Sequence, residues 1–151
     1  MGKGRTTTGM VCACLIQDAK RQLAGNGVTK GTPRDGHEYE LIDKLCDALP
    51  SAEVAKHRLD EILDLCSGMQ NLRECIGYAK QMYDKETEDR RTFWKRMAVN
   101  FIERRIYLVA FATYVYGHAD KDYDVTFVEF CTRHHHVLQT LARDVPKFNW
   151  E

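Results

Sequence analysis

The chain has 151 residues, of which 44% are apolar and 29% are charged, and this length and composition fit one globular domain with a buried core. Its 22 Lys and Arg residues balance 22 Asp and Glu residues, so no broad positive field exists to attract nucleic acid or anionic lipid. A nucleic-acid partner is therefore not expected, and an anion site would have to be local.

The apolar runs and the cysteines indicate the cellular compartment of the chain. The longest apolar run, 106–116, is shorter than the roughly 20 residues of a membrane-spanning helix, and the N-terminus lacks an apolar signal core. The six cysteines mostly occupy apolar positions of helical patterns, and Cys12 and Cys14 lack the spacing typical of zinc ligands or redox pairs. We expect reduced thiols, a cytoplasmic location, no membrane span, and neither a metal nor another cofactor.

The first predicted element is a helix from about Thr7 to Leu23. It is apolar on nearly all sides up to Gln17, as expected of a central helix that other elements surround. Residues 24–36 follow with four glycines and one proline, a composition that predicts a flexible surface loop.

The remainder of the chain predicts helices and no alternating strand. Apolar stripes indicate helices over 39–49 before Pro50, over 51–66 before Gly68, and over 72–83. The charged run 84–91 favours a solvated turn, and a long helix from about 91 to 117 comes next. Thr126 and Glu129 have the spacing of a capping box, which predicts a last helical stretch to about Arg143, ended by Pro146. The expected fold is mainly α, with five or six helices.

The N-terminal segment has features of a phosphate site. Arg5 lies between glycines and hydroxyl residues just ahead of the first helix, where free backbone N–H groups and the helix dipole favour an anion. A guanidinium also matches phosphate oxygens in a two-pronged geometry. The alternative is a glycine-rich terminus in which Thr6 or Thr7 caps the helix, and both interpretations stay open. No nucleophilic side chain precedes the segment.

Other candidate sites are less convincing. Lys3 is followed by Gly4 where a Walker-type loop needs Ser or Thr, and Cys12 and Cys14 lie too far along the helix to attack a phosphate on Arg5. His134, His135 and His136 are neighbours, whereas helical metal ligands are three or four residues apart, so a solvated helix edge is the better interpretation.

Polar residues also recur along the long predicted helix. Asn100, Glu103, Arg104 and Tyr107 are spaced to share one side, which indicates either a polar network, a surface for a partner, or an arginine that extends to solvent with Glu103 as its intrahelical partner. The last interpretation is the simplest.

Two segments together resemble a known family. The stretch 2–11 (GKGRTTTGMV) closely keeps the order of the loop Cys-x-Met-Gly-x-Gly-Arg-Thr-Thr-x-Gly-Met of the paladin-like branch of cysteine phosphatases, which is also classed with phytase-like inositol-hexakisphosphate phosphatases of the protein-tyrosine-phosphatase superfamily. Downstream, Gln70-Asn71-Leu72-Arg73 strengthens the likeness, because neither composition nor periodicity demands it. Further matching residues are Glu38, Tyr39, Ala55, Lys56, Asp60, Asp64, Asn100, Glu103 and Arg104.

The resemblance implies a particular domain organisation. Residues 1–128 would be the helical half of an α/β cysteine-phosphatase-like domain without its upstream strands, with a phosphate loop over 1–7, and residues 129–151 would form a C-terminal helix and tail. Arg5 would take the arginine position of the family signature. The nucleophilic cysteine would then lie two positions before Met1, and the chain would begin inside the active-site loop. Its expected partner would be the missing N-terminal half of the domain.

The resemblance also implies roles for residues of this loop. Arg5 would hold two phosphate oxygens, Thr6 would hydrogen-bond the thiolate, and Lys3 would add charge at the rim. The full expected phosphate-binding set is Gly2, Lys3, Gly4, Arg5, Thr6 and Thr7, with Arg5 and Thr6 as catalytic residues.

The expected function follows from these roles. The parent enzyme would hydrolyse phosphate monoesters of inositol polyphosphates or phosphoproteins, whereas this chain would be inactive alone because the cysteine and the general-acid aspartate are absent. The alternative is a non-catalytic helical interaction module, or pseudophosphatase, that binds phosphorylated ligands or protein partners.

Overall fold

The computed structural model describes residues 2–25, 39–66 and 71–148, and these ranges are helical and contain no strand, which confirms the mainly α prediction. The α-helices are α1 (Gly2–Leu23), α2 (Glu40–Ala48), α3 (Ala52–Leu65), α4 (Leu72–Lys85), α5 (Glu88–His118), α6 (Phe127–Arg133) and α7 (His135–Asp144). Two 3₁₀ helices complete the described part, η1 (Ala119–Lys121) and η2 (Val145–Lys147).

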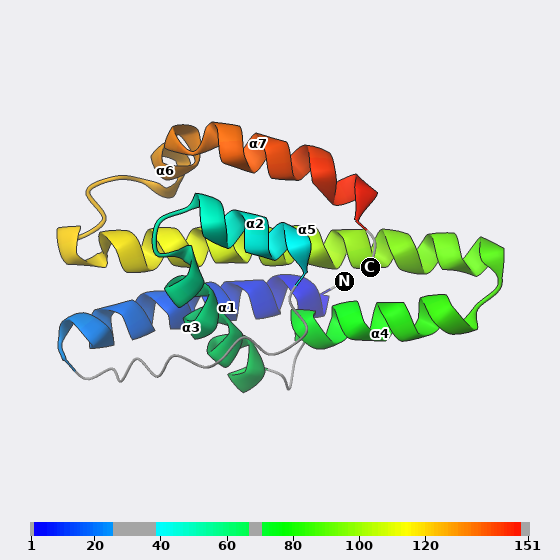
Figure 1. Ribbon diagram of the computed structural model, residues 1–151. Coiled ribbons are helices and arrows are strands. Elements are labelled where there is room, and N and C mark those ends of the chain that lie inside the picture. Colours follow the sequence, from blue (N-terminus) through cyan, green and yellow to red (C-terminus); the bar gives the residue numbers. More distant parts are fainter. Residues whose placement is uncertain (1, 26–38, 67–70, 149–151) are drawn as a thin grey trace.

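The helices pack around α5, which has 31 residues and runs the length of the molecule (Figure 1). Helices α2 and α7 lie on one side of α5, whereas α1, α3 and α4 lie on the other. The C-terminal half of α5 is apolar on most of its sides, and Ile102, Val109 and Val115 are fully or almost fully buried. The central helix of the fold is therefore α5.

Helix α1 differs in two respects from the sequence-based prediction. It begins at Gly2 rather than near Thr7, and it buries only one face, through Val11, Leu15 and Ala19. Gly9, Met10 and Ala13 are exposed on the remaining surface, so the prediction of a helix surrounded on all sides was wrong for the part of the chain that the structure describes. Low polarity alone does not specify which elements will cover a helix.

The ends of the middle helices follow local sequence signals. Helix α2 ends before Pro50, and Ser51 takes a left-handed conformation with φ 64° directly ahead of α3. The charged run 84–91 is mostly helical, because α4 and α5 are separated by Glu86 and Thr87 alone. The predicted turn is therefore only two residues wide. The predicted loop 24–36 is described at Ala24 and Gly25, which form a turn, and its remainder and the break at Gly68 lie outside the described residues.

The last helical stretch contains the predicted capping box. The Thr126 hydroxyl accepts a hydrogen bond from the Glu129 N–H at 3.1 Å, and the Glu129 carboxylate accepts one from the Thr126 N–H at 3.1 Å. The stretch is divided at His134 into α6 and α7, which the sequence did not indicate. The expected boundary between 128 and 129 falls inside α6.

Among the described helices, none combines the length and the apolar character that crossing a membrane requires.

Candidate functional site

The predicted phosphate-binding segment forms the first two turns of α1. Because the helix begins at Gly2, Thr6 and Thr7 lie inside it, and neither is its N-cap. The Arg5 side chain is exposed, whereas Thr7 is only 3% exposed, and the side chains of Lys3 and Thr6 lie outside the described part. The backbone N–H groups without an intrahelical partner are therefore those of the first turn, close to an accessible guanidinium.

Helix α5 contacts this end of α1 through Arg104. Its Nη2 donates a hydrogen bond to the Thr8 hydroxyl at 3.5 Å, the outer limit for such a contact. Arg104 therefore joins the start of α1 to α5. The interpretation of Arg104 as a residue that extends to solvent with an intrahelical Glu partner stays a prediction.

A buried charge cluster lies between α3 and α5. Asp60 accepts a hydrogen bond from Lys56 Nζ at 2.9 Å and lies 3.3 Å from Arg105 Nη2. All three side chains are buried, with relative exposures of 4% for Lys56, 8% for Asp60 and 1% for Arg105. Lys56, Asp60 and Arg105 thus bring their charges together in a buried environment. The free energy of keeping each charge buried there depends strongly on the opposite charge beside it. Asp60 fixes α3 against α5.

A second polar cluster joins α1, α3 and α5. The carboxylate of Asp18 accepts hydrogen bonds from Arg58 Nη2 and Nε, the latter at 3.0 Å, and from the Tyr116 hydroxyl. Arg58 also donates to Glu61 at 2.8 Å. Three helices that are distant in sequence therefore meet at one carboxylate.

The Asp18 cluster changes the ionisation of its members. Burial alone would raise the pKa of Asp18, but hydrogen bonds from Arg58 and Tyr116 and the charges of Arg58 and Arg21 outweigh it and lower that pKa. The pKa of Tyr116 is raised, first by burial and then by its hydrogen bond to Asp18. The hydrogen bond to Asp18 likewise raises the pKa of Arg58. Both partners therefore keep their protons while Asp18 stays ionised.

The Gln-Asn-Leu-Arg segment has a structural role that its described residues explain. Asn71 caps α4 by accepting a hydrogen bond from the Arg73 N–H at 3.0 Å, and its Nδ2 donates to Asp64 at 2.9 Å. Arg73 Nη1 also lies 3.3 Å from Asp64. The segment therefore attaches the start of α4 to the end of α3.

The described thiols are free, and several are less acidic than usual. Burial raises the pKa of Cys12 and of Cys131, and the pKa of Cys66 is raised by burial and by a contact with the Cys14 thiol. Because the thiolate is the nucleophile, these environments favour packing over attack on a substrate. Within the described ranges no three metal-binding side chains gather, and the His134 ring packs on Phe130 with centroids 4.6 Å apart.

Sequence reasoning found the residues of the two charge clusters only in part. Lys56 and Asp60 match the family that the sequence resembles, but the sequence assigned them no role. Their spacing of four places them together on the buried face of α3. Asp18, Arg58 and Arg105 were missed. A signal was present for Arg105, which stands among apolar residues of α5, but its partner is 45 positions away.

Comparison with known proteins gives one consistent relationship. No family model matches the chain. No solved structure matches it either. The chain is 28% identical to paladin of Danio rerio over 130 residues, which cover 77% of this chain and 15% of that protein. It is 30% identical to paladin of Gallus gallus over 130 residues and to paladin of Xenopus tropicalis over 133 residues, in each case over 76% of this chain and 14% of the relative. The chain thus spans about 15% of the length of these relatives, and the similarity supports a paladin-like relationship.

Proposed function

We propose that the chain is the helical part of a paladin-like domain of cysteine-phosphatase ancestry, with its phosphate-binding segment at the head of α1 and no catalytic activity of its own. The observation that carries the proposal is the order Gly-Lys-Gly-Arg-Thr-Thr over residues 2–7, in a chain similar to paladin over about three quarters of its length. In this proposal residues 1–128 belong to the domain and 129–151 form its C-terminal helix and tail.

The proposed chemistry assigns one part of a phosphatase mechanism to this chain. In a cysteine phosphatase a thiolate attacks phosphorus, an aspartic acid protonates the leaving oxygen, and an arginine stabilises the charge that spreads over the phosphoryl oxygens. Arg5 and Thr6 would supply the arginine and the hydroxyl, and the first-turn N–H groups of α1 would add fixed dipoles. The exposed Arg5 side chain supports this role because an anion from solvent can reach it.

The local charge supports a phosphate ester as the substrate class. Lys3 and Arg5 stand two residues apart next to the positive end of the helix dipole, which favours a multiply charged phosphate ester over a neutral ligand. Inositol polyphosphates and phosphorylated proteins both have this character. The same groups would hold either ligand without turnover.

A non-catalytic interaction module is the second candidate. The observation that favours it is the exposed side of α1, where Met10 is 44% exposed and adjoins the exposed Gly9 and Ala13. An apolar surface next to an anion-binding segment suits a protein partner or the rest of a larger domain.

A phosphatase assay and a binding measurement test the proposal together. With p-nitrophenyl phosphate the purified chain should give no hydrolysis above the protein-free rate, because none of its thiols stands ahead of Arg5. Turnover at ordinary phosphatase rates would refute the claim of inactivity.

Binding of inositol hexakisphosphate, measured by titration calorimetry, should be lost in Arg5→Ala. It should be retained in Arg21→Ala, which removes an exposed arginine from the other end of the same helix. Equal binding by wild type and Arg5→Ala would place the anion site elsewhere on the molecule.

A further inference from the structure

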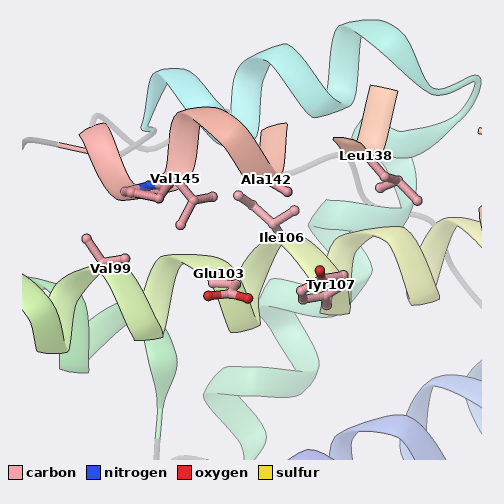
Figure 2. Close-up of a pocket in the computed structure, with 8 residues that line it drawn as sticks. Val99, Glu103, Ile106, Tyr107, Leu138, Ala142 and Val145 are labelled. Atoms are coloured by element: carbon pink, nitrogen blue, oxygen red, sulfur yellow. The ribbon is translucent and has the colours of Figure 1, made fainter. Parts of the chain in front are cut away.

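A small groove lies between α5 and the α7–η2 segment, on the side of α5 away from α1 (Figure 2). Its volume is about 80 Å³. Its floor is apolar: Ile106 and Val145 are each 4% exposed, and Leu138 is half-buried beside them. Such a floor accommodates the hydrocarbon part of a single side chain.

Two polar groups of α5 border this floor. Glu103 and Tyr107 are four residues apart, so they lie one turn from each other on the same side of the helix, as Figure 2 shows. Tyr107 is 50% exposed and Glu103 is exposed as well. A carboxylate and an aromatic ring therefore stand together at the edge of an apolar floor.

The Glu103 carboxylate is not a member of the ion pairs found in the part of the chain that the structure describes. The ion pairs of the described residues use other carboxylates, including those of Asp18, Asp60 and Asp64. Arg104, the adjacent cation, is directed to Thr8 of α1. A negative charge at the edge of an apolar surface attracts a cation more strongly than one surrounded by water, because the effective dielectric constant is lower there.

We propose that this groove binds one basic side chain, preferably arginine, presented by a partner protein. The methylene stem would lie on Ile106, Leu138 and Val145, while the guanidinium would pair with Glu103 and stack on the Tyr107 ring. Long basic side chains bury their stems in this manner and keep the charged head at the surface. A planar guanidinium is preferred to an ammonium because it forms two parallel hydrogen bonds to a carboxylate and stacks on aromatic rings.

The surroundings of the groove restrict the partner further. Arg143 and Lys147 are exposed and follow the groove residues Ala142 and Pro146 directly in sequence. Their charges disfavour a second basic residue in the partner. The partner segment therefore carries one arginine without another basic residue beside it.

Titration of the full chain with short capped peptides tests the proposal. The probe is acetyl-Leu-Arg-Leu-amide, and its neutral isostere has citrulline in place of arginine. Methyl resonances of Ile106, Leu138 and Val145 should shift with the arginine peptide, and the citrulline peptide should bind about tenfold more weakly, as expected when a charge-assisted hydrogen bond is replaced by a neutral one.

The variant Glu103→Gln should remove the preference for arginine over citrulline, whereas Asp47→Asn, an exposed carboxylate of α2, should keep it. Both substitutions are on the surface, and unchanged circular dichroism would show that the fold is retained. The proposal is overturned if the three methyl groups do not shift, if both peptides bind equally to the wild type, or if Glu103→Gln retains the preference.

Discussion

At the scale of single residues, the most consequential groups are the two carboxylates that hold helices together from inside. Asp60 lies between two buried cations, and Asp18 receives hydrogen bonds from two other helices. Buried ion clusters depend on every member, because removing one partner leaves a charge that water cannot reach. The stability of the fold should therefore respond more to these two residues than to the exposed ion pairs.

Replacing Asp60 by asparagine should lower the free energy of unfolding by about 3–5 kcal/mol, since Lys56 and Arg105 would lose the negative charge between them. Urea denaturation measures this change. Asp84→Asn serves as the comparison, because Asp84 and Lys80 are exposed and 3.9 Å apart, and such a pair contributes at most about 1 kcal/mol. A loss for Asp60→Asn no larger than that for Asp84→Asn would contradict a stabilising role of the cluster.

Asp18 should make stability depend on acid pH. Its pKa is lower in the folded chain than the usual value of about 3.9, so its stabilising contribution is complete above that value and is lost as the pH falls through the lower, folded pKa. Asp18→Asn should therefore reduce the fall in urea midpoint between about pH 5 and pH 3. The variant Asp47→Asn, on the exposed surface of α2, provides the control, and an identical pH profile for wild type and Asp18→Asn would exclude this account.

At the scale of the helices, local signals predicted where elements begin and end better than they predicted which faces are buried. The long apolar pattern located α5 within three residues at either end, and Thr126 located the start of α6. The break at His134 was missed because no proline or glycine marks it. The N-terminal start of α1 was missed because Gly2 and Gly4 favour a loop on propensity alone.

Thr126→Ala should lower the free energy of unfolding by about 1 kcal/mol, because the Glu129 N–H would lose the hydroxyl that accepts its hydrogen bond. Thermal denaturation would detect the change. Thr132→Ala is a matched control on the same helix, since the Thr132 hydroxyl donates only to the Val128 carbonyl oxygen, which is already in a helical environment. If both variants lose the same stability, the capping box is not the cause.

At the scale of the whole molecule, the sequence predicted the mainly α class but not the contacts between distant helices. Composition and periodicity carry no information on which helix pairs with which, so the contact between Asp60 and Arg105, 45 positions apart, could not be found. The groove between α5 and α7 could not be predicted either, although the spacing of Glu103 and Tyr107 indicates that these polar residues share one side of a helix. The role of the segment 2–7 stays a prediction.

The length of α5 has a further consequence for how this chain can vary. One continuous helix supplies Arg105 to α3, Tyr116 to α1 and Tyr107 to the groove beside α7. Each residue of an α-helix turns the chain by about 100°, so a single deletion between positions 107 and 116 would rotate Tyr116 away from Asp18 while leaving Arg105 in place. Substitutions at exposed positions of α5 outside the groove should therefore leave these contacts in place, whereas an insertion or deletion between them should not.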